Sequence, residues 1–203
     1  ERVKNYWATD LPVNKGQSNF DEISYEYYRD RDVATEAFKS GAFDLRAENQ
    51  SKRWATAYDF PALKEGKVKK ILIPHERPTG MQGFVFNTRK NFFSDPKVRL
   101  AINYAWDFEW TNKTLMYNAY KRTNSYFSNS ELSSSGRLPD GEELKILQKF
   151  KGQVPKQVFD EVYKAPQTDG SGNNRKNLRL ALKLLREAGW TVKDGKLVNR
   201  NGI

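Results

Sequence analysis

The sequence predicts an α/β fold, because three stretches combine strand and helix patterns. Residues 83–107 hold a short apolar run, then a break, then apolar residues at helical spacing. Residues 23–45 read in turn as a strand, a helix and a second strand. Residues 177–188 place leucine and alanine at the spacing of an amphipathic helix. Strands that alternate with helices are typical of a sheet covered by helices.

The first strand is expected at residues 23–27, where the side chains alternate in character. Asp30 or Asp32 can cap the helix that follows. Gly41 is placed to end that helix in a left-handed turn, before a second strand at residues 43–45. We expect the two strands to pair in parallel beneath the helix.

The next elements are a helix at residues 51–60 and a strand at residues 68–73. Trp54 and Tyr58 are spaced to share one side of the helix, and Pro61 limits it. Packing of Trp54 on the inner face of an amphipathic helix is one interpretation of this pattern.

Residues 79–83 are the candidate domain boundary, since this short stretch contains two glycines and joins two predicted strands. The apolar run at residues 84–86 predicts a buried strand, and residues 91–94 predict a break. A helix then begins at Asp95, which can accept hydrogen bonds from free backbone N–H groups. Pro96 fits the first helical position.

The second half of the chain is predicted to be mostly helical. A Ser- and Asn-rich loop, a Gly-rich loop and a hairpin on the Asp194–Gly195 turn complete it. We expect helices at residues 108–118, 141–150 and 177–188, a helical turn at 158–162, loops at 125–137 and 168–174, and the hairpin at 192–197.

The composition is that of a folded but polar chain. Of 203 residues, 37% are hydrophobic and 30% are charged, and the mean hydropathy is −0.85. The aromatic content of 13% supplies large apolar side chains, so we expect a core built on aromatics more than on aliphatics. No apolar run approaches the ~20 residues that span a bilayer. The absence of cysteine excludes disulfides and thiolate chemistry.

The net charge of +10 favours anionic partners. The basic residues are spread along the chain, which favours a solvated basic surface over a single basic arm. Aromatic and basic residues also interleave, as in Arg53–Trp54 and Tyr120–Lys121–Arg122. A basic nucleic-acid-binding module is therefore the alternative function, although we expect most of these aromatics to pack in the core.

No motif of an enzyme or of a metal site is present. His75 is the single histidine and lies just after a predicted strand, without a second ligand at metal-binding spacing. The sequence Gly170–Ser171–Gly172 lacks the Lys-Ser/Thr of a phosphate-binding loop. We therefore expect no catalysis, no metal and no cofactor.

The residue order at 86–107 resembles a signature of bacterial extracellular solute-binding proteins of the peptide/nickel class, which serve ABC importers. The resemblance rests on Phe86–Asn87, Phe92–Phe93, Asp95, Val98–Arg99, residues 101–105 and Asp107. The flanking residues 80–83 and 107–110 are similar to the YejA-type branch. Residues 39–44 and the Ala188–Gly189–Trp190 helix end also resemble the family.

The resemblance implies a fragment of a type II periplasmic-binding-protein fold, with mixed sheets, flanking helices and two partial lobes. Residues 1–79 would belong to lobe I and residues 80–203 to the first part of lobe III. Residues 79–83, where the chain would cross from one lobe to the other, would act as a hinge. The family's cleft then implies that Trp54, Thr79, Met81 and Gln82 lie at the ligand.

The implied function is periplasmic capture of an oligopeptide or a peptide-like antibiotic between the lobes. The lobes would then close around the ligand, and the protein would deliver the ligand to an inner-membrane ABC permease. The resemblance further implies a monomer that binds no nucleic acid. A fragment with no activity of its own is a further alternative.

Overall fold

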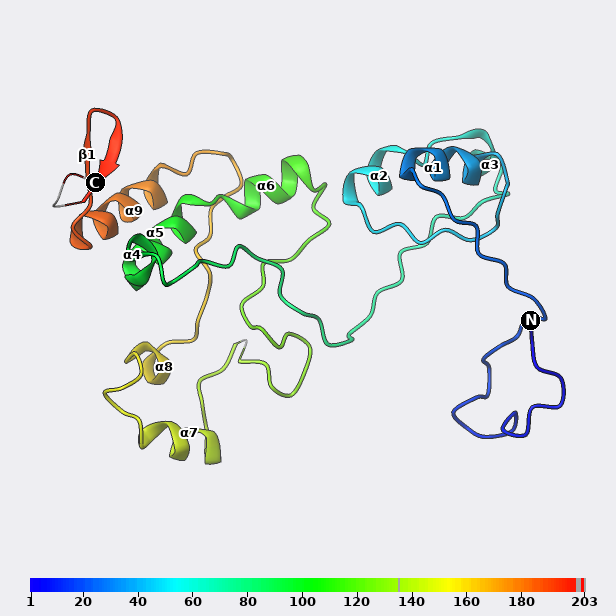
Figure 1. The fold of residues 1–203 in the computed structure, drawn as a ribbon, viewed down its shortest axis with the longest axis horizontal. Coiled ribbons are helices and arrows are strands. Elements are labelled where there is room, and N and C mark those ends of the chain that lie inside the picture. Colours follow the sequence, from blue (N-terminus) through cyan, green and yellow to red (C-terminus); the bar gives the residue numbers. More distant parts are fainter. Residues whose placement is uncertain (135, 200–201, 203) are drawn as a thin grey trace. The chain divides into compact units, whose positions relative to one another are not determined.

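A computed structural model describes residues 1–134, 136–199 and 202, and it divides the chain into two compact units. The first unit spans residues 1–70 and the second spans residues 71–203 (Figure 1). The boundary between the two units, after residue 70, lies before the lobe boundary predicted after residue 79. The assignment of residues to lobes stays a prediction. Each unit is described by itself.

The first unit contains three helices, α1 (Arg31–Lys39), α2 (Ser51–Thr56) and α3 (Pro61–Lys64). Asp30 caps α1, because its side chain accepts hydrogen bonds from the N–H groups of Asp32 and Val33 at 2.7 and 3.1 Å. Gly41 follows the helix with φ +82°, the left-handed conformation that glycine adopts without strain. Both predicted helix ends are confirmed.

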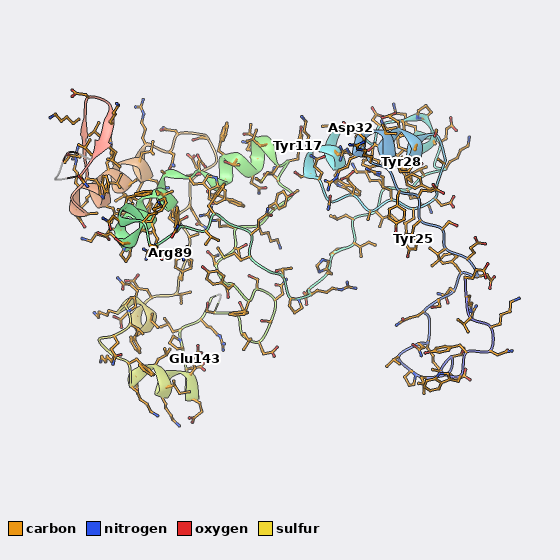
Figure 2. The ribbon with its side chains drawn as sticks, viewed as in Figure 1. Tyr25, Tyr28, Asp32, Arg89, Tyr117 and Glu143 are labelled. Atoms are coloured by element: carbon orange, nitrogen blue, oxygen red, sulfur yellow. The ribbon has the colours of Figure 1, made fainter. Side chains whose placement is uncertain are left out.

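Aromatic rings pack together in the first unit, as the composition predicts. The ring of Phe38 lies 5.5 Å from Phe43, 6.3 Å from Tyr58 and 6.5 Å from Phe60, between centroids. Tyr28 adds a further contact with Phe43 at 5.8 Å. Figure 2 labels Tyr28 on the segment that leads into α1. These edge and tilted contacts supply the apolar burial that the few aliphatic residues of this unit do not.

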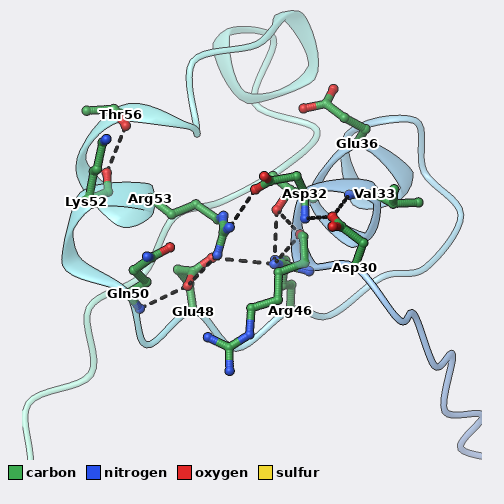
Figure 3. Close-up of polar contacts among 12 residues, drawn as sticks. Asp30, Asp32, Val33, Glu36, Arg46, Glu48, Gln50, Lys52, Arg53 and Thr56 are labelled. Carbon is green, nitrogen blue, oxygen red and sulfur yellow. Dashed lines mark hydrogen bonds and ion pairs between the residues drawn. The ribbon is translucent and has the colours of Figure 1, made fainter.

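A polar network joins the loop before α2 to both neighbouring helices (Figure 3). The side chain of Glu48 is only 4% exposed and accepts hydrogen bonds from the Gln50 N–H and the Tyr58 hydroxyl, each at 3.0 Å. Arg46 lies 3.6 Å from Glu48. Arg53 reaches from α2 to Asp32 on α1 at 2.6 Å and lies 3.9 Å from Glu48. The loop is thereby fixed by charged groups at both ends.

The second unit is helical and ends in a hairpin. Its helices are α4 (Asn91–Ser94), α5 (Pro96–Ala105), α6 (Phe108–Leu115), α7 (Gly141–Gln148), α8 (Gln157–Asp160) and α9 (Arg175–Glu187). Strands β1 (Thr191–Lys193) and β2 (Lys196–Val198) pair antiparallel. Asp194 and Gly195 both have positive φ, as a tight hairpin turn requires, so the predicted hairpin is confirmed.

The core of the second unit lies between α5 and α9, which run side by side (Figure 1). Val98 and Ala101 are buried on α5, and Asn177 and Ala181 are buried on α9. Ala101 is 1% exposed, and such small side chains let two helices approach closely. As predicted, Asp95 caps α5 by accepting from the Lys97 N–H at 2.7 Å, and Pro96 takes the first helical position.

The predicted strands at residues 23–27, 43–45, 68–73 and 84–86 do not form, and this prediction was wrong. β1 and β2 are the named strands among the described residues, so the expected mixed sheets with flanking helices are not seen there. A strand exists only when a neighbour accepts and donates its backbone hydrogen bonds. Here the apolar runs stay exposed instead, up to 97% at Val85.

Two further local predictions need correction. Residues 91–94, predicted as a break, form the short helix α4, whose carbonyls at Phe93 and Ser94 accept hydrogen bonds from Arg99. The helix predicted over residues 51–60 ends at Thr56, and Pro61 begins α3 rather than only closing α2. Each helix of the described residues is too short or too polar to cross a lipid bilayer.

The Gly-rich loop before α9 packs closely on α6. Gly170 is buried, and a Cβ added there would lie 3.5 Å from Cβ of Glu109. A Cβ added to Gly172 would lie 3.0 Å from the Trp110 ring, which is tighter than nine in ten real Cβ contacts. The absence of a side chain at Gly172 therefore lets the loop lie against the start of α6 without displacing the Trp110 ring.

We predict that Gly172→Ala destabilises the protein more than Gly152→Ala does. Both residues have positive φ, +82° and +91°, so each alanine is strained by about 1–2 kcal/mol. Only Gly172 also faces the Trp110 ring; overpacking adds about 1–3 kcal/mol there. Thermal unfolding followed by circular dichroism measures the difference. Equal losses for both variants would show that the contact with Trp110 does not matter for stability.

We predict that Glu48→Gln lowers the free energy of unfolding by about 1–3 kcal/mol at pH 7, as for other hydrogen bonds to charged groups. Burial raises the pKa of Glu48, but the hydrogen bonds and the charges of Arg53 and Arg46 hold it below its ordinary value. The stability from this carboxylate is therefore present above a pH of about 4.3 and is lost as the pH falls.

The measurement is urea unfolding of both proteins between pH 7 and pH 3. The difference in the free energy of unfolding between wild type and Glu48→Gln should shrink as the pH falls. Glu36→Gln is the matched control, because Glu36 is exposed and pairs only with Lys39 on the same helix. Glu36→Gln should change the free energy of unfolding by close to zero. If the difference between wild type and Glu48→Gln stays constant with pH, the charge of Glu48 does not have the predicted role.

Candidate ligand-binding site

Trp54, the predicted site residue of the first unit, lies half-buried on α2. Its ring lies 6.1 Å from Tyr58, and the Lys70 ammonium lies 4.5 Å from the ring centroid. Lys70 also donates a hydrogen bond to the Trp54 carbonyl. The side chain is thus partly packed and partly exposed, so both interpretations of Trp54 remain open.

Thr79, Met81 and Gln82 lie together on one exposed segment of the second unit. The Thr79 N–H donates to the Ser128 carbonyl at 3.0 Å, and the Asn129 side chain donates to the Arg77 carbonyl at 3.3 Å. The segment is therefore held beside the Ser- and Asn-rich loop, which the sequence predicts only as a loop. Trp54 belongs to the first unit, and its contacts are those given above.

Two carboxylates meet at the start of α6. Asp107 caps the helix by accepting from the Trp110 N–H at 3.0 Å, and it also accepts from the Thr168 hydroxyl at 2.5 Å. Glu109 accepts from the Thr168 N–H at 3.0 Å, and its oxygen lies 3.2 Å from the same hydroxyl. One hydroxyl proton serves two carboxylates, and the second oxygen of Asp107 is buried without a partner among the described residues.

Arg122 lies beside this pair on an aromatic surface. Its guanidinium carbon is 4.3 Å from the Trp106 ring centroid and 5.3 Å from that of Phe108. The Nη2 atom donates to the Asn103 side-chain oxygen at 2.5 Å. The Nη1 atom is buried and has no acceptor among the described residues. Burial lowers the pKa of Arg122 from its ordinary value.

Further asparagines fasten the segment before α9 to these helices. The Asn174 amide donates to the carbonyls of Tyr104 and Ala105 at the end of α5, both at 3.1 Å, while its own oxygen is buried and has no partner in the part of the chain that the structure describes. Asn177 donates to the Gln167 carbonyl at 3.0 Å. We call this region, where α5 ends and α6 begins, the α5–α6 junction. It comprises Asn103, Trp106, Asp107, Phe108, Glu109, Arg122, Thr168 and Asn174.

Sequence reasoning did not identify the α5–α6 junction as a site. Asn103 and Asp107 belong to the family signature, and Phe108 and Glu109 belong to the residues that flank it, but none of them is predicted as a site residue. Arg122 was counted among the dispersed basic residues, and Thr168 fell in a predicted loop. Among the described residues, the three buried side-chain polar atoms without partners, on Asp107, Arg122 and Asn174, all belong to this junction. Such atoms are costly in a folded protein and mark it as the strongest candidate for binding a polar ligand group.

The chemistry available here is binding by charge, hydrogen bonds and aromatic surface. Within the described residues, no three His, Asp or Glu side chains gather as a metal site would require. His75 lies exposed, and its ring nitrogen accepts only from the Arg77 N–H at 3.3 Å. An open hollow at residues 85–89 is lined by consecutive residues of a single segment.

Comparison with known proteins identifies the family. The model described as "Bacterial extracellular solute-binding proteins, family 5 Middle" matches residues 1–201. The chain is 49% identical over 201 residues to a probable peptide-binding protein YejA of Agrobacterium fabrum, covering 98% of this chain and 33% of the relative. It is 48% identical to the uncharacterized protein YejA of Escherichia coli K12, covering 98% of this chain and 33% of that relative.

Another relative is the peptidoglycan-binding protein YepA of Agrobacterium fabrum, 40% identical over 209 residues, which cover all of this chain and 34% of the relative. The chain therefore spans about a third of the length of the curated relatives it matches. Both the family match and the identities extend over nearly the whole chain. The chain belongs to the bacterial extracellular solute-binding proteins of family 5, and within them to the YejA type.

Proposed function

We propose that this chain is part of the periplasmic solute-binding component of a bacterial ABC importer, and that its solute is a peptide or a peptide-like compound. The observation that carries the proposal is the 49% identity, over nearly the whole chain, to a protein named as a probable peptide-binding protein. In this role the protein captures its ligand without catalysis and passes it to a membrane permease. We expect it to act as a monomer.

The proposal keeps the predicted lobes and hinge. Residues 1–79 would form part of lobe I and residues 80–203 the first part of lobe III, with residues 79–83 as the hinge. Support comes from the exposed backbone of that segment, since hinge residues need few packing constraints in order to change their dihedral angles. Trp54, Thr79, Met81 and Gln82 would line the ligand, as an aromatic wall and polar groups suited to a peptide main chain.

Peptides derived from peptidoglycan are a second ligand class. The relative YepA is named as a peptidoglycan-binding protein and is 40% identical over the full length of this chain. Such a ligand shares the peptide backbone with the first class and adds sugars and further carboxylates. The same set of polar and aromatic side chains would suit both classes.

Titration calorimetry of the intact protein against defined pools of short peptides tests the proposal. We predict binding, with affinity reduced about 10- to 100-fold by Trp54→Ala and by Gln82→Ala, as for side chains that contact a ligand directly. Trp7→Ala is the matched control, because Trp7 is 84% exposed and belongs to no predicted site. Thermal unfolding checks that each variant is folded.

The competing function is tested with the same protein. A basic nucleic-acid-binding module would bind an oligonucleotide with an affinity that falls steeply as salt rises. Nucleic-acid binding of that kind, together with no heat from any peptide pool, would contradict the proposed function. Peptide binding that neither substitution weakens would leave the function intact and remove Trp54 and Gln82 from the site.

A further inference from the structure

We infer that Arg122, held on the ring of Trp106, binds a carboxylate group of the ligand. The inference rests on the proposed function and adds the chemical class of one ligand group and the residue that receives it. It concerns the second unit alone, where Arg122, Trp106, Phe108 and Asn103 all lie.

The hydrogen bonding of the Arg122 guanidinium is incomplete among the described residues. An arginine side chain carries five N–H donors in a fixed plane. The acceptor that Arg122 has found is the neutral amide oxygen of Asn103, on Nη2. Its Nη1 atom is buried and faces no acceptor in the part of the chain that the structure describes. A buried donor without an acceptor is destabilising, and an acceptor brought by a ligand removes that penalty.

Arg122 also lacks an ion-pair partner in the described part of the chain. Among the described residues, no carboxylate lies within ion-pair distance of its guanidinium. Asp107 and Glu109 accept hydrogen bonds from Thr168 and at the start of α6 instead. Burial lowers the pKa of Arg122, and the more distant Tyr163 and Glu109 offset this only in part. An anionic group within hydrogen-bond distance would complete the compensation.

The side chain of Arg122 is also held in orientation by aromatic rings. Trp106 makes edge contacts with Phe84 at 6.4 Å and with Phe108 at 5.7 Å, so three rings form one aromatic platform beneath Arg122. Stacking of the guanidinium on Trp106 holds its plane, so hydrogen bonds form only at its edge, where Nη2 donates to Asn103 and Nη1 has no acceptor among the described residues. The planar carboxylate, with two oxygens at matching spacing, is the group that such an edge recognises best.

Arg122 is connected to the predicted site through the aromatic rings. Gln82 and Phe84 are separated by one residue, and the Phe84 ring contacts the ring that supports Arg122. Trp106 and Phe84 both keep exposed surface, at 37% and 85%. A peptide that lies along the segment at Met81 and Gln82 can therefore reach the aromatic platform and place a carboxylate at Arg122.

The test is a thermodynamic cycle on the intact protein. Short Ala/Gly tetrapeptides are titrated in two forms, with a free carboxyl terminus and with a terminal amide. We expect the wild type to bind the free acid at least tenfold more tightly than the amide. In Arg122→Gln the two forms should bind equally. Arg122→Lys keeps the charge but not the paired donors, so it should retain only part of the preference.

A third peptide set separates the two sources of a carboxylate. These peptides carry a terminal amide and one glutamate side chain. If they recover tight binding in the wild type but not in Arg122→Gln, Arg122 receives a side-chain carboxylate. If only the free acid binds tightly, it receives the carboxyl terminus. Either result supports the inference.

Arg89→Gln is the matched control, since it removes the same charge from an exposed position labelled in Figure 2. It should leave the acid-to-amide ratio unchanged. If peptides bind but every form binds the wild type equally, or if Arg122→Gln and Arg89→Gln behave alike, the inference is wrong while the proposed function stands. If no peptide of any form binds the folded wild type, the proposed function fails, and the inference fails with it.

Discussion

The packing of α5 against α9 is the contact on which the second unit depends. It joins segments eighty residues apart in the chain through small buried side chains, Ala101 on one helix and Ala181 on the other. Because these helices approach closely, the residues that precede α9 are brought to the end of α5. The Asn174 amide then binds the last carbonyls of α5, which would otherwise lack partners at that helix end. Helix packing and helix capping therefore support one another.

The α5–α6 junction follows from that constraint. Once the segment before α9 is fixed, Thr168 lies within hydrogen-bond distance of Asp107 and Glu109, and Gly172 fits against Trp110. Both carboxylates then accept hydrogen bonds from Thr168, and neither lies within ion-pair distance of Arg122, although the charge of Glu109 acts on it from farther away. The lack of an ion-pair partner for Arg122 among the described residues is thus a consequence of how the helices pack. Such positions, held rigidly and left unsatisfied, are where a folded protein can bind a charged ligand group at small reorganisation cost.

Local signals in the sequence predicted the helix ends well and the strands poorly. Asp30, Gly41 and the Asp95–Pro96 pair act within a few residues of themselves, so their effect can be deduced from neighbours alone. The apolar runs at residues 68–73 and 84–86 have the composition of strands, but a strand needs a partner that the local pattern does not specify. The junction was missed for the same reason, since Thr168 meets Asp107 across sixty-one positions of sequence. Family resemblance supplied the function class, which no local pattern carries.

The basic character of the chain and the single cation at the junction act over different distances. A net charge of +10, spread over exposed lysines and arginines, attracts anions from afar, and salt screens this attraction within about 10 Å at 0.1 M. Arg122 is shielded by aromatic rings, so salt weakens a contact made there much less. On the proposed function, the dispersed charge would speed the approach of anionic ligands without choosing among them. Selection would fall to Arg122, because only there do a fixed plane, an unfilled donor and a missing counter-ion coincide within the residues that the structure describes.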